Sequence, residues 1–229
     1  MGNLSEFLME ELNVATAFTI PIFGGIEVAE STVISWVIMA IIVILTLVLT
    51  RNMRVEKPGK LQVGVEYAVT ALQNLVRGII GHEGERYVPY LSTVLVFLGI
   101  SNIFAIFGMK PPTKDLNVTA ALALMSIILV QAASIRQNKV GGWLKGFTKP
   151  SKVITPLNVM ELAIRPLSLC MRLFGNVLGA FVVMKLLEHL VPIILPAVFS
   201  LYFDFFDGLI QAYVFVFLTG LFIKEAVED

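Results

Sequence analysis

The sequence predicts an all-α integral membrane protein with about five membrane-embedded helices. Hydrophobic residues make up 57% of its 229 residues, a larger share than soluble domains contain. They gather in runs of about 20 residues, the length that a helix needs to cross a hydrocarbon core about 30 Å thick. The 17 basic and 17 acidic residues lie mainly between these runs and cancel to a net charge of zero, so nothing indicates a nucleic-acid partner.

The first three spans are predicted by apolar runs at 31–50, 87–108 and 116–134. Between the first two, Pro58 and the following glycine interrupt the chain, and apolar residues then recur at helical spacing over 61–79. This pattern is typical of an amphipathic helix that lies at the membrane interface.

The last two embedded helices are expected over 156–190 and 196–224, joined by a reversal at VPIILPA. The first of them is longer than a perpendicular crossing requires. This length predicts that it is strongly tilted or lies partly in the membrane plane. The chain shows no internal repeat of the kind found in many secondary transporters.

Basic residues predict the orientation of the chain in the membrane. They concentrate in the loops 51–86 and 136–152, whereas segment 1–30 has none. The positive-inside rule therefore places both loops and the C-terminus in the cytoplasm and the N-terminus outside. We expect a single membrane domain over 1–229, in which the helical hairpin 156–224 carries the functional residues.

Polar and small residues share one face of the long fourth helix. Ser168, Arg172, Gly175, Asn176 and Gly179 recur at three- and four-residue spacing. The two glycines form a G-x-x-x-G pair, which lets another helix approach closely. An arginine cannot lose its charge and costs about 3 kcal/mol at the bilayer centre, so a function is the usual reason to keep one there. The alternative for Arg172 is a structural arginine that pairs with a carboxylate inside the bundle or snorkels to the interface.

A second arginine, Arg165, lies nearer the cytoplasmic entry of this helix and precedes a proline. Glu161 lies four residues before it, and this spacing predicts an ion pair on the helix surface. In the alternative interpretation, Glu161 lies at the cytoplasmic end of an ion path.

The final helix carries Asp204, Asp207 and Gln211 at three- and four-residue spacing. Two aspartates on one face of a span indicate an aqueous path, because carboxylates in dry lipid would be neutral or absent. In the alternative reading they lie close to the outer surface and are merely solvated. Gln211 lies deeper, and we expect its amide to hydrogen-bond to the neighbouring helix, where Arg172 is the natural partner.

The sequence predicts neither a metal site nor a cofactor. Its one cysteine, Cys170, excludes an intramolecular disulfide and is expected to serve packing. Neither a C-x-x-C motif nor histidines and cysteines at metal-ligand spacing occur. An intramembrane enzyme is also disfavoured, because the chain lacks a Ser/His pair, an H-E-x-x-H motif and paired aspartates on separate spans.

Four segments, taken in this order along the chain, resemble the a subunit of F-type ATP synthases. The likeness covers most of the chain from about residue 30 onward. The segments are KPGKLQ (57–62), ISNIFAIFGMKPPTKDLNVTAALAL (100–124), RPLSLCMRLFGN (165–176) and QAYVFVFLT (211–219).

The resemblance implies a non-catalytic, ion-translocating subunit of a rotary ATP synthase in a bacterial plasma membrane. Arg172 would be the essential arginine between two half-channels and would face the ring of c subunits. The last two helices would be tilted and packed against that ring, with Ser168, Gly175 and Gly179 in the contact. Further partners would be the b subunits of the peripheral stalk, the remaining synthase subunits and the lipid bilayer. The coupling ion would be a proton or Na⁺, with the proton expected.

The resemblance also assigns roles to other polar residues. Asn176 and Gln211 match family positions near the arginine, and Glu161 lies close to the acidic group of the cytoplasmic half-channel. Some members carry a glutamate where this chain has Phe181, and a histidine where it has Asp204. Asp204 and Asp207 are therefore the candidates for the external half-channel, by their chemistry and location and not by identity with family residues.

One other class of membrane protein competes with this interpretation. An ion-coupled secondary transporter would use Arg172 to bind an anionic substrate. Such a carrier needs an enclosed site and usually an internal repeat, whereas this chain offers an open face of small residues and few spans.

Overall fold

The computed structural model describes residues 16–21, 26–56, 58–104, 110–146, 155–190 and 199–228. Helices dominate these residues, so the predicted all-α class is confirmed. In chain order the elements are β1 (Thr16–Ile20), β2 (Ile26–Ala29), α2 (Glu30–Thr50), α3 (Lys60–Ile80), the 3₁₀ turn η1 (Glu85–Tyr87), α4 (Val88–Ile103), the 3₁₀ turn η3 (Pro112–Lys114), α5 (Leu116–Gly146), α6 (Thr155–Leu190), the π-helix η5 (Leu201–Asp207) and α8 (Gly208–Glu228).

A short hairpin precedes the first span and was not expected from the sequence. Strands β1 and β2 pair in antiparallel fashion, with Phe18 opposite Val28 and Thr19 opposite Glu27. Both strands are rich in β-branched and apolar residues, which favour extended backbone.

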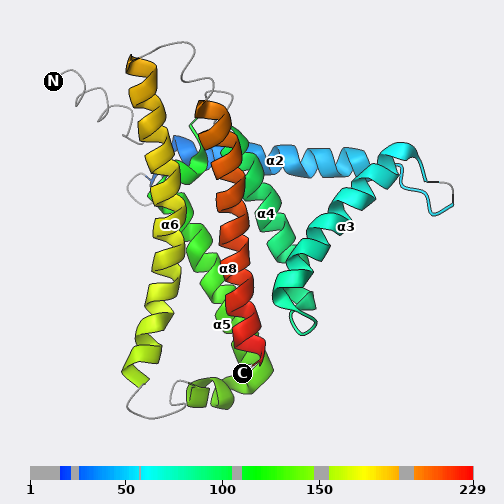
Figure 1. The fold of residues 1–229 in the computed structure, drawn as a ribbon, viewed down its shortest axis with the longest axis vertical. Helices are drawn as coiled ribbons and strands as arrows, with labels where there is room; N and C mark the ends of the chain where they lie inside the picture. The colour runs from blue at the N-terminus through cyan, green and yellow to red at the C-terminus, as the bar shows by residue number, and fades with distance from the viewer. Residues whose placement is uncertain are drawn as a thin grey trace.

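Helix α2 confirms the first predicted span and lies across the rest of the molecule (Figure 1). Its first turn is attached to the start of α5, because the hydroxyl of Ser31 donates to the Asp115 carboxylate. Ser35 closes the same turn by donating to the Ser31 carbonyl at 2.8 Å. In the second half of α2, apolar side chains such as Leu47 and Val48 are exposed. Such a helix suits lipid or another membrane helix.

The amphipathic helix expected at 61–79 is present as α3. Its last turns bury Val76, Ile79 and Ile80 against α4 and α8. Gly220 of α8 makes this contact possible, because a Cβ at that position would lie 2.9 Å from Ile79 Cγ2. The first half of α3 leaves apolar side chains exposed, and its position at the membrane interface stays a prediction.

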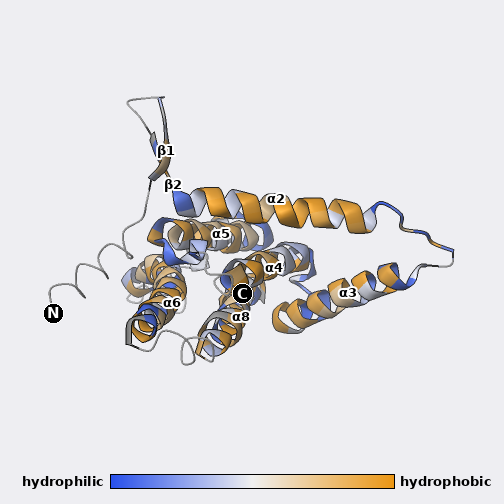
Figure 2. Cartoon of the chain, turned by 90° about the horizontal axis from the view of Figure 1, so that it is seen from above, coloured by the Kyte–Doolittle hydropathy of each residue, from blue (hydrophilic) through white to orange (hydrophobic). Residues whose placement is uncertain are grey.

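Helices α4, α5, α6 and α8 form the packed part of the molecule. Seen from above, α2 lies on one side, α4 and α5 lie in the middle, and α6 and α8 lie on the opposite side (Figure 2). Helix α6 packs mainly on α5, whereas α8 packs on α4, α5 and α3, and α6 and α8 contact each other little. Because lipid is as apolar as leucine, these helices associate through close side-chain packing. The fully buried packing residues include Leu91, Leu98, Val130, Leu173, Val216 and Ile223.

Four helices of the described part have the length and hydropathy to cross a membrane. The predicted span at 87–108 is described only as α4, which has 16 residues, and residues 105–109 lie outside the described part. The predicted count of five embedded segments therefore stays a prediction.

Helix α5 extends beyond the predicted end of the third span at residue 134 and runs to Gly146. It kinks at Lys139, whose φ of 57° is not helical. After the kink, Trp143 Nε1 donates to Gln131 Oε1 at 2.8 Å and holds the last turns back against the helix. Part of the basic segment predicted as a loop at 136–152 is therefore helical, because no glycine or proline interrupts it before the kink.

The long fourth helix is confirmed as α6, with 36 residues that include Pro166. The final predicted helix, 196–224, differs at its start. In the described part, Phe199 and Ser200 are α-helical, the π-helix η5 follows, and α8 continues to Glu228.

Candidate functional site

Helix α6 buries one face and exposes the opposite one. Leu169, Cys170, Leu173 and Val177 are buried, on the side that packs against α5. The opposite face forms a line of exposed residues at three- and four-residue spacing, which we call the α6 stripe. Its members are Ile164, Leu167, Ser168, Met171, Arg172, Gly175, Asn176, Gly179 and Val183.

Arg172 lies in the middle of the α6 stripe and is exposed. Its guanidinium Nη2 donates one long hydrogen bond, 3.4 Å, to Ser168 Oγ on the preceding turn. Within the part of the chain that the structure describes, it forms no ion pair. The neighbouring stripe residues Leu167 and Met171 are 61% and 52% exposed, so the charge sits in an apolar surface. A structural pair inside the bundle, the alternative weighed above, is not formed by the described residues.

The two stripe glycines are not used to pack this chain. A Cβ built on Gly175 or on Gly179 would meet no atom within 4 Å. Gly208 and Gly220 of α8 differ, because a Cβ there would lie under 3.0 Å from an atom of another helix. The G-x-x-x-G pair therefore leaves a shallow, unoccupied surface that another helix could approach closely.

Gln211 and Arg172 were expected to be in contact, but the structure does not bring them together. Gln211 is half-buried on α8, and among the described residues Arg172 hydrogen-bonds to Ser168. The expectation failed because α6 packs mainly on α5 while α8 packs on α4, α5 and α3, so that α6 and α8 contact each other little. Asn176, on the α6 stripe, is exposed.

The acidic residues before α8 lie in a segment of π-helix. Asp207 is half-buried at the last residue of η5, and the side chain of Asp204 lies outside the described part. Hydrogen bonds in a π-helix run over five residues, so a spacing of three no longer places two side chains on one face. The shared face expected for Asp204, Asp207 and Gln211 rested on α-helical spacing, and the backbone does not follow that spacing before Gly208.

A buried hydrogen-bond network fixes the start of α8. The side-chain amide of Asn102 donates to the Gly208 carbonyl at 2.8 Å, and Thr113 Oγ1 donates to Asn102 Oδ1 at 2.8 Å. Both side chains are buried, so these bonds satisfy groups that water does not reach. In the sequence, an asparagine within an apolar span is the one sign of this network, and its partners cannot be found from the pattern.

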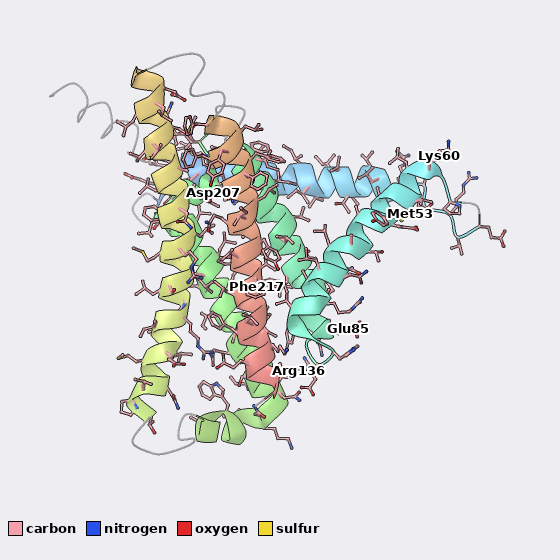
Figure 3. The ribbon with its side chains drawn as sticks, in the orientation of Figure 1. Met53, Lys60, Glu85, Arg136, Asp207 and Phe217 are labelled. Carbon is pink, nitrogen blue, oxygen red and sulfur yellow. The ribbon has the colours of Figure 1, made fainter. Side chains whose placement is uncertain are left out.

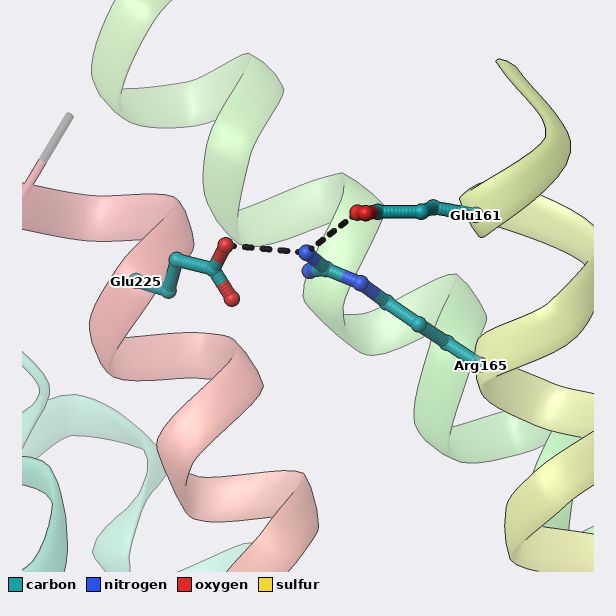
Figure 4. Close-up of polar contacts among 3 residues, drawn as sticks. All are labelled: Glu161, Arg165 and Glu225. Carbon is teal, nitrogen blue, oxygen red and sulfur yellow. Dashed lines mark hydrogen bonds and ion pairs between the residues drawn. The ribbon is translucent and has the colours of Figure 1, made fainter. Parts of the chain in front are cut away.

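The predicted ion pair between Glu161 and Arg165 is confirmed, and it has a third member. Arg165 Nη2 lies 3.0 Å from Glu161 Oε2 and 2.8 Å from Glu225 Oε1 on α8 (Figure 4). The guanidinium also lies over the Phe222 ring, 5.0 Å from its centroid. Glu225 was missed because its sequence, KEAVED at the end of the chain, is typical of a solvated terminus.

Phe181, which stands where some members of the resembled family carry a glutamate, contacts two cations. Lys114 Nζ lies 3.6 Å from its ring centroid, and Lys185 Nζ lies 5.8 Å from it. Lys185 also pairs with Glu188 at 2.9 Å. Both cations thus lie within cation–π distance of the Phe181 ring.

Comparison with known proteins shows the family of this chain. The family model described as the ATP synthase A chain matches residues 32–224. The chain belongs to the ATP synthase A chain family. The matched residues run from α2 into α8, so the α6 stripe and most residues of the Arg165 ion-pair cluster lie within this family's part of the chain.

Curated members of the ATP synthase A chain family are similar over nearly the whole chain. ATP synthase subunit a of Moorella thermoacetica is 37% identical over 90% of this chain and 94% of its own length. ATP synthase subunit a 1 of Hahella chejuensis is 32% identical over 90% of this chain and 87% of its own. The relative from Propionigenium modestum, named ATP synthase subunit a, sodium ion specific, is 30% identical over 90% of this chain and 76% of its own.

Proposed function

We propose that this chain is the ion-translocating a subunit of a rotary F-type ATP synthase in a bacterial plasma membrane. It has no catalytic site of its own and passes ions between two half-channels and a ring of c subunits. The observation that supports this function is Arg172, a permanent charge on the exposed α6 stripe, without an ion-pair partner among the described residues. Such a charge needs a partner from outside these residues.

Arg172 acts on each ring carboxylate as it passes. Its fixed positive charge stabilises the ionised form of a nearby carboxylate and so favours release of the bound ion. The same charge repels cations and prevents their direct passage between the half-channels. Asn176 and Gln211 supply amide groups near this point that hydrogen-bond to water or to the carboxylate.

The small residues of the α6 stripe form the surface along which the ring slides. Gly175 and Gly179 have free space above them, and Ser168 adds only a hydroxyl, so a ring helix can approach closely. The direction of α2 supports this arrangement, because α2 lies across α6 and α8 (Figure 1). With α2 upright in the bilayer, α6 and α8 are strongly tilted, as helices along the rim of a ring would be.

The half-channels open at opposite ends of the pair formed by α6 and α8. Asp204 and Asp207 serve the external half-channel, and Glu161 serves the cytoplasmic one. The structure supports a polarity of this kind, because Asp207 lies toward one end of the bundle and Arg136 toward the other (Figure 3).

The orientation and the remaining partners follow from the same proposal. The segments 51–86 and 136–152 and the C-terminus face the cytoplasm, and segment 1–30 faces outside. The exposed apolar side chains of α2 and of the first half of α3 face lipid and the b subunits of the peripheral stalk. The proton is the proposed ion, and Na⁺ is the competing one because a relative is named as sodium ion specific.

The experiment that tests this function is ATP-driven ion pumping by the whole complex in liposomes. Arg172→Ala should abolish pumping while the complex still assembles. Arg54→Ala is the matched control, because Arg54 is an exposed arginine far from the α6 stripe whose backbone, rather than its side chain, contacts Gln62. Normal pumping by assembled Arg172→Ala complexes would refute the proposal.

The same liposomes identify the ion. Collapse of the pumped gradient by a protonophore, without any dependence on Na⁺, is the result expected for a proton. Uptake of Na⁺ that requires external Na⁺ and persists with a protonophore would instead identify a sodium-specific subunit, like the relative of that name.

A further inference from the structure

The first half of α6 has little packing to hold it in place. None of the residues from 155 to 168 is buried, and the first buried residue of the helix is Leu169. Leu157 and Met160 in this half are both 56% exposed. After Leu169, by contrast, one face of the helix is packed on α5. Apolar packing therefore holds this half less firmly than the half after Leu169.

Pro166 stands between the two halves. A proline within a helix removes one backbone hydrogen bond and crowds the carbonyl four residues before it, so the helix bends easily at this point. Arg172 lies beyond the proline, on the half packed against α5, at about 10 Å along the axis from Arg165. The alignment of the α6 stripe on the two sides of Pro166 therefore depends on the contacts that hold the half carrying Arg165.

An ion pair to α8 supplies that attachment. Arg165 lies between Glu161 of its own helix, at 3.0 Å, and Glu225 of α8, at 2.8 Å. The Arg165 side chain is 24% exposed and Phe222 of α8 lies under its guanidinium, whereas the Glu161 and Glu225 side chains are 47% and 51% exposed, so water screens the two pairs in part. We call Glu161, Arg165 and Glu225 the α6–α8 clasp.

We propose that Glu225 is a positioning residue for ion translocation, acting through Arg165. The clasp holds the first half of α6 against α8 and keeps the α6 stripe straight across Pro166, so that Arg172 meets the ring at the right depth. This inference rests on the proposed function. Without Glu225, the first half of α6 swings away from α8, the contact with the ring loosens, and ions leak past Arg172 without driving rotation.

The first test compares Glu225→Gln with wild type in reconstituted complexes. We expect ATP-driven pumping per assembled complex to fall by about threefold to tenfold, and the passive ion leak of the membrane sector to rise. Glu85→Gln is the matched control, because it breaks the Arg77–Glu85 ion pair, 3.0 Å, away from α6 and α8. Pumping and leak equal to wild type in Glu225→Gln would overturn the proposal.

A charge exchange separates positioning from a general loss of stability. In the double variant Arg165→Glu with Glu225→Arg, the guanidinium comes from α8 and the two carboxylates from α6, so the clasp is rebuilt in reverse. We expect this double variant to recover pumping that both single variants lose. Failure to recover in assembled complexes would mean that Arg165 or Glu225 acts at its own position, and the clasp would be refuted.

Distances between spin labels measure the proposed movement directly. Labels on cysteines at the exposed positions Leu157 and Leu221, in a Cys170→Ala background, report the separation of the first half of α6 from α8. We expect one narrow distance distribution in wild type, a broader and longer one in Glu225→Gln, and recovery in the exchanged double variant. Unchanged distributions would contradict the proposal. Normal pumping by Arg172→Ala would refute the proposed function itself, whereas loss there with no effect at Glu225 would refute the clasp alone.

Discussion

The side-chain amide of Asn102 on α4 donates a hydrogen bond of 2.8 Å to the backbone carbonyl of Gly208, at the junction where the π-helix η5 becomes α8. A Cβ on residue 208 would lie 2.8 Å from Asn102 Cβ. The amide can reach that carbonyl because residue 208 has no side chain. The contact ties the start of α8, and with it Asp207, to a buried position on α4.

Replacement of Asn102 by alanine should destabilise this junction. The variant leaves the Thr113 hydroxyl without its acceptor and the Gly208 carbonyl without its donor, in a buried place, at a cost of about 1–3 kcal/mol. Thermal unfolding of the purified complex in detergent should show release of the subunit at a lower temperature than in wild type. Thr93→Val is a suitable control, since it removes an exposed hydroxyl that bonds within the same helix. Equal release temperatures for wild type and Asn102→Ala would contradict the role given to this network.

Alanine should impair assembly at Gly208 and leave it unchanged at Gly175. Gly208→Ala forces a Cβ against Asn102, and overpacking of this kind costs about 1–3 kcal/mol. Gly175→Ala meets free space within the chain and should leave the fold intact. The amount of subunit a recovered in the purified complex measures both. A normal yield of Gly208→Ala would show that α4 and α8 separate easily at this point.

A bulky residue at a stripe glycine should affect pumping rather than folding. Gly175→Leu adds a side chain to a surface that this chain leaves free, so the subunit should still fold while its contact with the ring is obstructed. We expect ATP-driven pumping to fall by about tenfold or more. Gly64→Leu, on the exposed first half of α3, is the control, because that position also has nothing within 4 Å. Equal pumping by both leucine variants would place the ring elsewhere.

Removal of both external carboxyl charges should slow ion entry from outside. The double variant Asp204→Asn with Asp207→Asn keeps the size of both side chains and removes their ability to attract cations or pass protons. ATP synthesis driven by an imposed ion gradient should fall, with normal amounts of assembled complex. An unchanged rate of synthesis would mean that the external path runs elsewhere.

Local patterns in the sequence predicted the features that depend on neighbouring residues. Helical spacing placed Ser168, Arg172 and Asn176 on one exposed face, and the four-residue spacing of Glu161 and Arg165 predicted their ion pair. Contacts between distant segments could not be found in this way. Glu225 lies 60 residues from Arg165, and its sequence surroundings are those of a solvated chain end.

Other differences arise where the backbone departs from the pattern assumed. The spacing of Asp204 and Asp207 indicates one face only for an α-helix, and no residue type marks a π-helix in advance. Gln211 was expected beside Arg172, since adjacent helices in a hairpin usually pack together. Here both helices pack on α5 and contact each other little, and the Arg165–Glu225 ion pair is one link between them.

The exposed guanidinium of Arg172 also affects the free energy of the unassembled subunit relative to the assembled one. A single copy in lipid carries a charge that its described residues do not neutralise, at a cost of about 3 kcal/mol. A partner carboxylate removes that cost, and 3 kcal/mol corresponds to more than a hundredfold change in an equilibrium constant. Arg172, the residue proposed to drive transport, therefore also raises the free energy of a solitary subunit in the bilayer. This cost favours assembly of each copy into the complex.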